Sequence, residues 1–348
     1  MTYKLIDAKE IEKALLWLSK YWNRPTHPEY YHAKTVDEAV SLLDEYGEEA
    51  KIIAGGIDLV GLMKNKVLSP GVLVNIKTIP HMEYVVEDTG GVAIGALTLI
   101  NDIERSALIK SKYPILFEAA RSTASPQIRN MATIGGNLCQ EVRCWYYRRS
   151  PVTGISFDCR RKGENGICYA INGENQNHAI IGGNKCFAVC PSDMATALLA
   201  LDARINTVNT SGGRTIPIDR FYTTLGNVLE PNELITSIQV PEVDSGAKQR
   251  FLKFRIRKTT DFAIASVAAV ITLNKNIVSG ARIVLGGVAP QPYRAVKAEE
   301  SIIREPIKES VVAEAAKASV NKAMPLSKNG YKISIIEALV KRALLGQV

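Results

Sequence analysis

All six cysteines of this 348-residue chain lie in one segment, between Cys139 and Cys190. The segment is rich in glycine, asparagine and charged residues and lacks helix or strand periodicity, so it predicts a long loop inserted between regular elements. No pair has the CxxC spacing of zinc ribbons and thioredoxin-like proteins, and the bacterial ferredoxin run is also missing. Spacing alone leaves four alternatives open: an iron–sulfur cluster, a zinc site of unusual spacing, disulfides, or unrelated buried thiols.

The composition favours an ordinary globular protein in a reducing compartment. Residues 1–16 carry acids and lysines where a signal peptide needs an apolar core, and no apolar run approaches the length of a membrane span. We therefore expect a soluble, cytoplasmic protein with reduced thiols, and disulfides become the least favoured alternative. The chain is 46% hydrophobic and 22% charged, with a modest net charge of +8. Because it has no basic-aromatic stripe, neither nucleic acid nor membrane is expected as a partner.

The pattern of apolar residues predicts alternating helices and strands in the first third and a strand-rich last third. Residues 1–24 form an amphipathic pattern that ends before Pro25 and Pro28, and a strand at 51–54 runs directly into Gly55 and Gly56. A domain boundary is expected near Val243. The other predicted elements are helices at 36–46, 59–66, 114–124, 191–203, 295–303, 309–323 and 333–344, strands at 72–75, 92–94, 251–258, 265–273 and 281–289, and a hairpin at 204–218.

Two glycine pairs, in AGGID at 54–58 and in ATIGGN at 132–137, each follow an apolar stretch. Glycine lets a backbone pass close to a ligand, and successive free N–H groups form an anion-binding concavity. Neither pair has the GxGxxG or P-loop pattern, so a Rossmann dinucleotide site and ATP hydrolysis are not indicated. Each pair is compatible with a phosphate-binding turn or with a plain tight turn.

Four motifs resemble those of one family and occur in its order: AGGIDLVGLMKNK, SPQIRNMATIGGNL, PSDMATALLALDA and FLKFRIRKTTDFAIASVAA. The family is that of the FAD-binding medium subunits of xanthine dehydrogenase-type molybdenum hydroxylases. The resemblance implies an α+β fold: a two-subdomain, PCMH-like FAD-binding fold, followed by a three-stranded antiparallel sheet with helices. It divides the chain into an N-terminal helical extension (1–28), an FAD-binding domain (29–243) and a C-terminal domain like that of CO dehydrogenase flavoproteins (244–348).

The cysteine segment resembles the insertion in flavin subunits of 4-hydroxybenzoyl-CoA reductase and of periplasmic aldehyde oxidoreductases, where it holds a [4Fe–4S] cluster. The matching stretches are RCWYYRRSP, the segment from FDCRRKGENGICYA to AIIGG, and NKCFAVCPSD. By position, the resemblance implies Cys144, Cys159, Cys168 and Cys186 as ligands and leaves Cys139 and Cys190 as non-ligands. The interval before Cys186 is longer than in the reductase, so Cys190 is the alternative to it. His178 is expected to make a structural hydrogen bond.

The same resemblance implies the residues that hold FAD. Both glycine turns are expected on the pyrophosphate, an acidic residue near the ribose or pyrophosphate, and a lysine near the flavin ring. The residues that match these positions are Ile53, Ala54, Gly55, Gly56, Ile57, Asp58, Leu59, Ala132, Thr133, Ile134, Gly135, Gly136, Asn137, Asp193 and Lys253. No catalytic acid–base set is visible, as expected for an electron-transfer subunit.

We therefore expect an FAD- and [4Fe–4S]-binding subunit that moves electrons between FAD, a small [2Fe–2S] subunit and a one-electron carrier such as ferredoxin. A large molybdopterin-binding subunit would transform the substrate, in a complex expected to be a dimer of heterotrimers. Two alternatives stay open: a non-catalytic scaffold with an empty or zinc-filled loop, and a stand-alone flavin oxidase.

Overall fold

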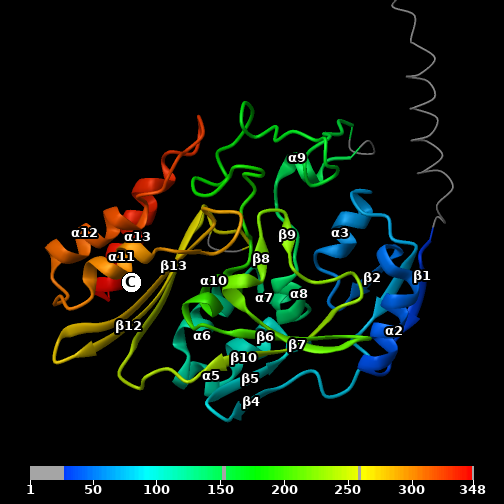
Figure 1. Ribbon diagram of the computed structural model, residues 1–348, viewed down its shortest axis with the longest axis horizontal. Helices are drawn as coiled ribbons and strands as arrows, with labels where there is room; N and C mark the ends of the chain where they lie inside the picture. Colours follow the sequence, from blue (N-terminus) through cyan, green and yellow to red (C-terminus); the bar gives the residue numbers. More distant parts are fainter. Residues whose placement is uncertain (1–26, 151–153, 258–259, 347–348) are drawn as a thin grey trace, which may run out of the picture.

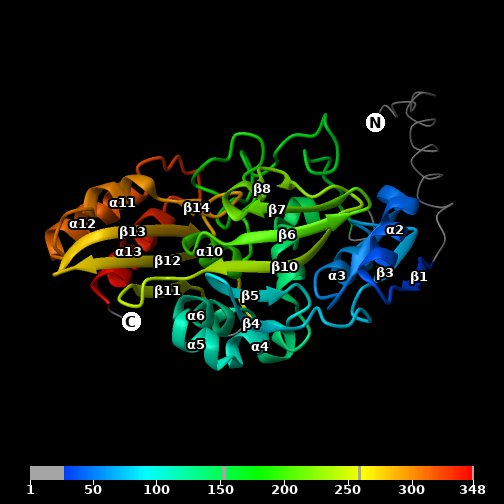
Figure 2. The same ribbon diagram turned by 60° about the horizontal axis from the view of Figure 1, so that its bottom comes forward.

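The computed structural model describes residues 27–150, 154–257 and 260–346 (Figure 1). The helix expected at 1–24 lies outside the described residues. Three lobes follow one another along the long axis: a small α/β unit, a central antiparallel sheet, and a C-terminal sheet with helices (Figure 2). None of the helices in the described part of the chain is long and apolar enough to cross a membrane. The predicted α+β class is confirmed.

The α/β unit is a parallel three-stranded sheet with strand order β1-β3-β2. Its middle strand is buried at every position, which fits the continuous apolar run VLVN. Helix α2 begins after Thr35, whose side chain accepts a hydrogen bond from the Glu38 backbone N–H, and it ends at Gly47, which has φ +50°. The elements are β1 (Glu29–His32), α2 (Val36–Tyr46), a 3₁₀ turn (Gly47–Glu49), β2 (Ala50–Ile53), α3 (Leu59–Lys64) and β3 (Val72–Asn75).

The central lobe is a five-stranded antiparallel sheet with strand order β4-β5-β10-β6-β7. The predicted hairpin is present as β6 and β7. The strand that pairs with β6 on its other side is β10, from later in the chain. The strands are β4 (Val85–Asp88), β5 (Gly91–Gly95), β6 (Arg204–Asn209), β7 (Gly212–Pro217) and β10 (Leu234–Pro241), with a small β8–β9 hairpin (Tyr222–Thr223, Gly226–Asn227) and a 3₁₀ turn (Ile218–Arg220). The helices are α4 (Ile100–Arg105), α5 (Ala107–Lys112), α6 (Pro114–Ser122), α7 (Pro126–Arg129), α8 (Ile134–Leu138) and α10 (Asp193–Ala200).

The C-terminal lobe is an antiparallel sheet with strand order β11-β12-β13-β14. Three long strands were expected and are found, and a two-residue fourth strand completes the sheet. Successive residues of β12 pack into two different cores: Val267 and Ala269 against the C-terminal helices, Ala268 and Val270 against the central lobe. The elements are β11 (Lys248–Phe254), β12 (Ala265–Asn274), β13 (Ile277–Gly286), β14 (Tyr293–Arg294), α11 (Val296–Ile302), α12 (Glu309–Ser319) and α13 (Lys332–Leu345).

The cysteine loop, residues 139–190, runs along one side of the molecule from the α/β unit to the C-terminal lobe (Figure 1, green, top). Its described part holds a single helix, α9 (Trp145–Arg148). Near its end, Ile180 and Ile181 are buried in the C-terminal core. The Asn329 side-chain amide donates to the carbonyls of His178 and Ala179, at 3.1 Å each. The loop is therefore anchored on the C-terminal lobe although it begins beside the α/β unit.

Candidate flavin site

A cavity of about 820 Å³ lies where the three lobes meet. Its size falls in the range of pockets that bury a cofactor. Ile134 and Gly135 do not line it and are buried in the wall behind. The structure brings the other predicted FAD residues together on its lining: Ile53, Ala54, Gly55, Gly56, Ile57, Asp58, Leu59, Ala132, Thr133, Gly136, Asn137, Asp193 and Lys253.

The first glycine turn offers a run of unused donors to this cavity. Among the described residues, the backbone N–H groups of 55–59 have no protein acceptor. Gly56 has φ +70°, a conformation that side chains disfavour, and a Cβ on Gly55 would overlap the Met131 carbonyl. Because backbone donors rarely stay unpaired in a folded protein, this run fits an anionic ligand.

The second glycine turn differs from the first because the protein itself uses its donors. The N–H of Gly135 donates to the Ala96 carbonyl at 2.9 Å, and that of Gly136 to the Thr133 hydroxyl at 3.1 Å. The Ser192 hydroxyl donates to Asn137 Oδ1 at 2.6 Å, which ties the turn to the start of α10. This turn is therefore a rigid, close-packed wall rather than a second row of free donors.

A buried ion pair forms another part of the wall. Lys253 Nζ on β11 lies 2.6 Å from Asp193 Oδ2 at the start of α10, and the two side chains are only 3% and 5% exposed. Lys253 Nζ also donates to the Ser122 carbonyl at 3.1 Å. Sixty residues apart in sequence, the two charges join the central lobe to the C-terminal sheet at the cavity.

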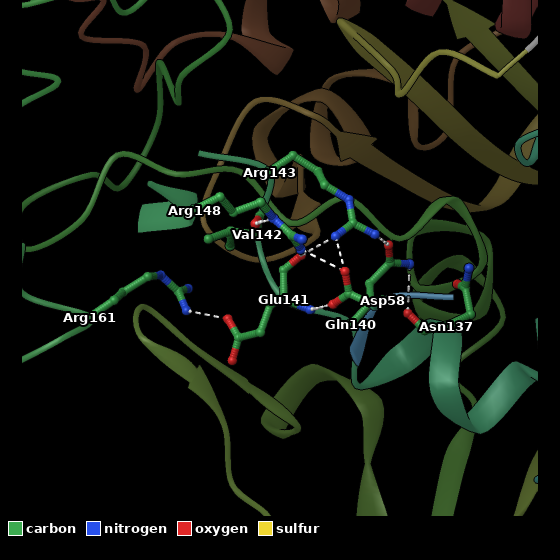
Figure 3. Close-up of polar contacts among 8 residues, drawn as sticks. All are labelled: Asp58, Asn137, Gln140, Glu141, Val142, Arg143, Arg148 and Arg161. Carbon is green, nitrogen blue, oxygen red and sulfur yellow. Dashed lines mark hydrogen bonds and ion pairs between the residues drawn. The ribbon is translucent and has the colours of Figure 1, made fainter. Parts of the chain in front are cut away.

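Asp58 faces the cysteine loop (Figure 3). Its Oδ2 accepts from the Glu141 backbone N–H at 2.7 Å, and its Oδ1 accepts from Arg148 Nη2 at 2.7 Å and from Arg143 Nη1. Arg161 Nη1 in turn lies 3.1 Å from Glu141 Oε2. Three basic residues of the cysteine loop, Arg143, Arg148 and Arg161, thus pair with carboxylates beside the cavity.

Sequence reasoning missed several lining residues. Arg143 lies 4.7 Å from the ring centre of Phe262, and both line the cavity. Ala124 lines it with φ +46°, and Arg129 Nη1 donates to the Thr123 and Ala124 carbonyls at 3.0 and 3.4 Å. Left-handed backbone at a non-glycine residue is strained, and such strain is enriched at functional sites. Arg129 belongs to the motif SPQIRN, but nothing in the local sequence predicts that its side chain binds the Thr123 and Ala124 carbonyls.

Three of the four predicted ligand thiols converge beside the cavity. Cys159 and Cys186 share a small buried cluster with Leu62, and Cys144 packs against it. Cys190 instead belongs to the main core. Cys168 is half-buried and outside the cluster. Within the described residues, no three His, Cys, Asp or Glu side chains stand in a metal-binding arrangement.

The surroundings of these sulfurs resemble those of thiolate ligands. The backbone N–H groups of Tyr146 and Tyr147 act to lower the pKa of the Cys144 thiol, and those of Arg161 and Lys162 act to lower the pKa of Cys159, although burial outweighs them. Such N–H donors stabilise metal-bound thiolates. Without a metal, burial raises the pKa of the Cys144 thiol to about 12. A metal group bound by these sulfurs would hold them as thiolates, so its binding would release protons.

His178 makes the structural contact that was expected of it. Its Nε2 lies 3.3 Å from Cys144 Sγ. Burial, and then the Lys332 ammonium, lower the pKa of His178 to about 4, so the imidazole is neutral near pH 7.

Comparison with known families gives two matches that together span most of the chain. Residues 24–144 and 172–243 match the FAD binding domain in molybdopterin dehydrogenase, and residues 250–347 match the CO dehydrogenase flavoprotein C-terminal domain. The chain belongs to this flavoprotein family. Residues 145–171, in the cysteine loop, fall outside both matches.

Relatives of the chain are flavin subunits of oxidoreductase complexes. It is 34% identical to the aldehyde oxidoreductase FAD-binding subunit PaoB of Escherichia coli, over 73% of this chain and 79% of that one. It is 30% identical to the carbon monoxide dehydrogenase medium chain of Hydrogenophaga pseudoflava, over 92% and 96%. A solved structure of carbon monoxide dehydrogenase from H. pseudoflava superposes with a TM-score of 0.74 and 29% identity, covering 92% of this chain and 97% of that one.

Proposed function

We propose that this chain is the FAD- and [4Fe–4S]-binding electron-transfer subunit of a molybdenum hydroxylase-type complex. The observation that carries the proposal is the cavity, which joins five unused backbone donors at 55–59 to the buried Lys253–Asp193 pair. The family of the chain makes FAD the ligand that fits this lining. FAD would supply two-electron chemistry that divides into single-electron steps.

The first turn is proposed to bind the pyrophosphate through its N–H groups, with Gly136 and Asn137 as the opposing wall. Gly135 does not line the cavity and instead supports this wall by packing against Ala96. Lys253 is proposed to lie toward the flavin ring, where a cation favours a reduced, anionic ring. Asp193 holds that cation in place through the 2.6 Å ion pair.

The cysteine loop is proposed to hold a [4Fe–4S] cluster through Cys144, Cys159, Cys168 and Cys186. Support comes from the convergence of three of these thiols in and beside one buried cluster, and from neighbouring backbone N–H groups that favour the thiolate form of Cys144 and Cys159. Cys190 is not favoured as a ligand because its side chain packs in the main core, away from the cluster of Cys159 and Cys186. Such a cluster would supply a one-electron relay.

The names of the relatives support partner subunits for this chain as well. PaoB is a subunit of an aldehyde oxidoreductase, and the H. pseudoflava protein is a medium chain. We propose a large molybdopterin-binding subunit, a small [2Fe–2S] subunit and an external one-electron carrier as partners, in a dimer of heterotrimers. Domain boundaries at 28/29 and 243/244 are also proposed, and they lie near the ends of the two family matches. A cytoplasmic location is proposed because none of the six cysteines, all within the described residues, forms a disulfide bond.

Purification of the tagged chain from its host tests this proposal. We expect equimolar FAD, roughly four irons per chain, and two co-purifying subunits identified by mass. Individual serine variants of the four proposed ligands should lose iron and still bind FAD when it is added in excess, while Cys139→Ser should keep both cofactors as purified. Zinc in place of iron, with no flavin, would favour the scaffold. Flavin with no partner and direct oxygen turnover would favour the stand-alone oxidase.

A further inference from the structure

Arg148 is connected to the cavity without lining it. Its Nη2 donates to Asp58 Oδ1 at 2.7 Å and to the Glu141 carbonyl at 3.0 Å, and its Nε donates to the Val142 carbonyl at 2.7 Å (Figure 3). The side chain is 18% exposed and Asp58 is 16% exposed. A charge-assisted pair with this much burial holds its partners in place better than a surface pair does.

The position of Arg148 depends on Cys144. Helix α9 spans only Trp145–Arg148, and Cys144 is its N-cap residue. The backbone N–H of Arg148 donates to the Cys144 carbonyl at 3.0 Å. Because so short a helix is not stable by itself, whatever fixes Cys144 also fixes Arg148.

The other end of the connection reaches both glycine turns. Asp58 belongs to the first turn, and in the described part of the chain its carboxylate is held by residues 141–148. Arg143 Nη2 donates to Gln140 Oε1 at 2.9 Å, and Gln140 Nε2 donates to the Asn137 carbonyl in the second turn at 2.9 Å. One continuous polar network therefore joins the start of the cysteine loop to both walls of the cavity.

We propose that the Asp58–Arg148 pair couples FAD binding to occupancy of the cysteine loop. This rests on the proposed function and assigns a positioning role to both residues. A ligated Cys144 holds α9, α9 holds Arg148, and Arg148 holds the first glycine turn in the shape that presents its N–H groups. Such coupling is reciprocal, so FAD must strengthen metal binding by the same factor.

FAD titration of four chains tests the coupling: metal-loaded wild type, metal-loaded Arg148→Gln, Cys144→Ser, and the double variant Arg148→Gln/Cys144→Ser. We expect each single variant to raise the FAD dissociation constant about tenfold, and the double variant to raise it no further. Treating the wild type with an iron chelator should reproduce the Cys144→Ser value. The matched control is Arg149→Gln, because Arg149 is the exposed neighbour and its side chain has no hydrogen bond or ion pair with the residues that the structure describes.

Additive losses in the double variant would overturn the coupling, since two merely structural defects add. So would unchanged affinity in Arg148→Gln. If that variant misfolds, Asp58→Asn breaks the same pair from the other side and must give the same non-additive cycle. Wild-type protein with no affinity for FAD would overturn the proposed function and the coupling together, whereas normal wild-type affinity with additive losses overturns the coupling alone.

Discussion

At Gly55 the first glycine turn passes so close to the Met131 carbonyl that one methyl group does not fit. Gly55→Ala is therefore expected to push the two turns apart, lower the free energy of unfolding by about 1–3 kcal/mol, and reduce FAD binding sharply. Thermal unfolding and FAD titration measure the two effects. Gly61→Ala is the control, because a Cβ at Gly61 in α3 meets nothing within 4 Å. Normal FAD affinity in Gly55→Ala would show that the turns need not touch.

The Lys253–Asp193 pair gives a second test at the residue scale. Lys253→Ala leaves the Asp193 carboxylate buried and unpaired, so we expect about 3–5 kcal/mol less stability and weaker FAD binding. The double variant Lys253→Met/Asp193→Leu should recover most of the stability but not the FAD affinity. Recovery of both would mean that the pair is only structural.

Residue identities in the two turns were predictable because glycine pairs and their flanking motifs are local. The difference between the two turns was not predictable. Only the structure shows that the Ala96 carbonyl and the Thr133 hydroxyl accept hydrogen bonds from the N–H groups of the second turn. Asp58 was expected at the site, and its partners Arg143 and Arg148 were visible only as basic residues of the loop. Their pairing depends on contacts more than 80 residues apart in sequence.

Among the elements, α2 and β3 were predicted with their observed bounds because a cap, a glycine stop and a continuous apolar run define them. Strand β2 begins and ends one residue earlier than predicted. Strand β10 went unpredicted although it is the centre of the five-stranded sheet. Its residues mix apolar and polar types, and a register irregularity between Ile235 and Ser237 breaks their alternation.

The end of the cysteine loop supports a prediction at the element scale. Cys186 packs beside Cys159, whereas Cys190 is buried in the main core with its thiol pKa raised to about 12 by burial. Cys186→Ser should therefore lower the iron content, and Cys190→Ser should leave it unchanged. Iron analysis of the two purified variants shows whether Cys186 or Cys190 is the ligand. The reverse pattern would make Cys190 the ligand.

At the scale of the whole molecule, Lys332 at the start of α13 joins the C-terminal lobe to the cysteine loop. It is 0% exposed, and its Nζ donates to the carbonyls of Gly287 at 2.8 Å and Asn177 at 3.1 Å. Burial lowers its pKa from 10.5 to about 7. Between these two values the unfolded chain holds a proton that the folded chain lacks, so the free energy of unfolding rises with pH across that window.

Lys332→Met should remove that rise, which is expected to amount to a few kcal/mol. Urea unfolding at several pH values between about 7 and 10 measures it. Lys317→Met, at an exposed position of α12, should keep the wild-type slope. A Lys332→Met protein with the same slope as the wild type would assign the pH dependence to other groups.

The central claim is that the cavity between the three lobes binds FAD. The FAD dissociation constant of the purified wild-type chain tests this claim most directly. Titration of flavin-free protein with FAD, followed by fluorescence, is predicted to show saturable equimolar binding that FMN, which lacks the pyrophosphate, does not match. An affinity for FAD no greater than for FMN, or no saturable binding in correctly folded protein, would contradict the assignment of the 55–59 donors to a pyrophosphate.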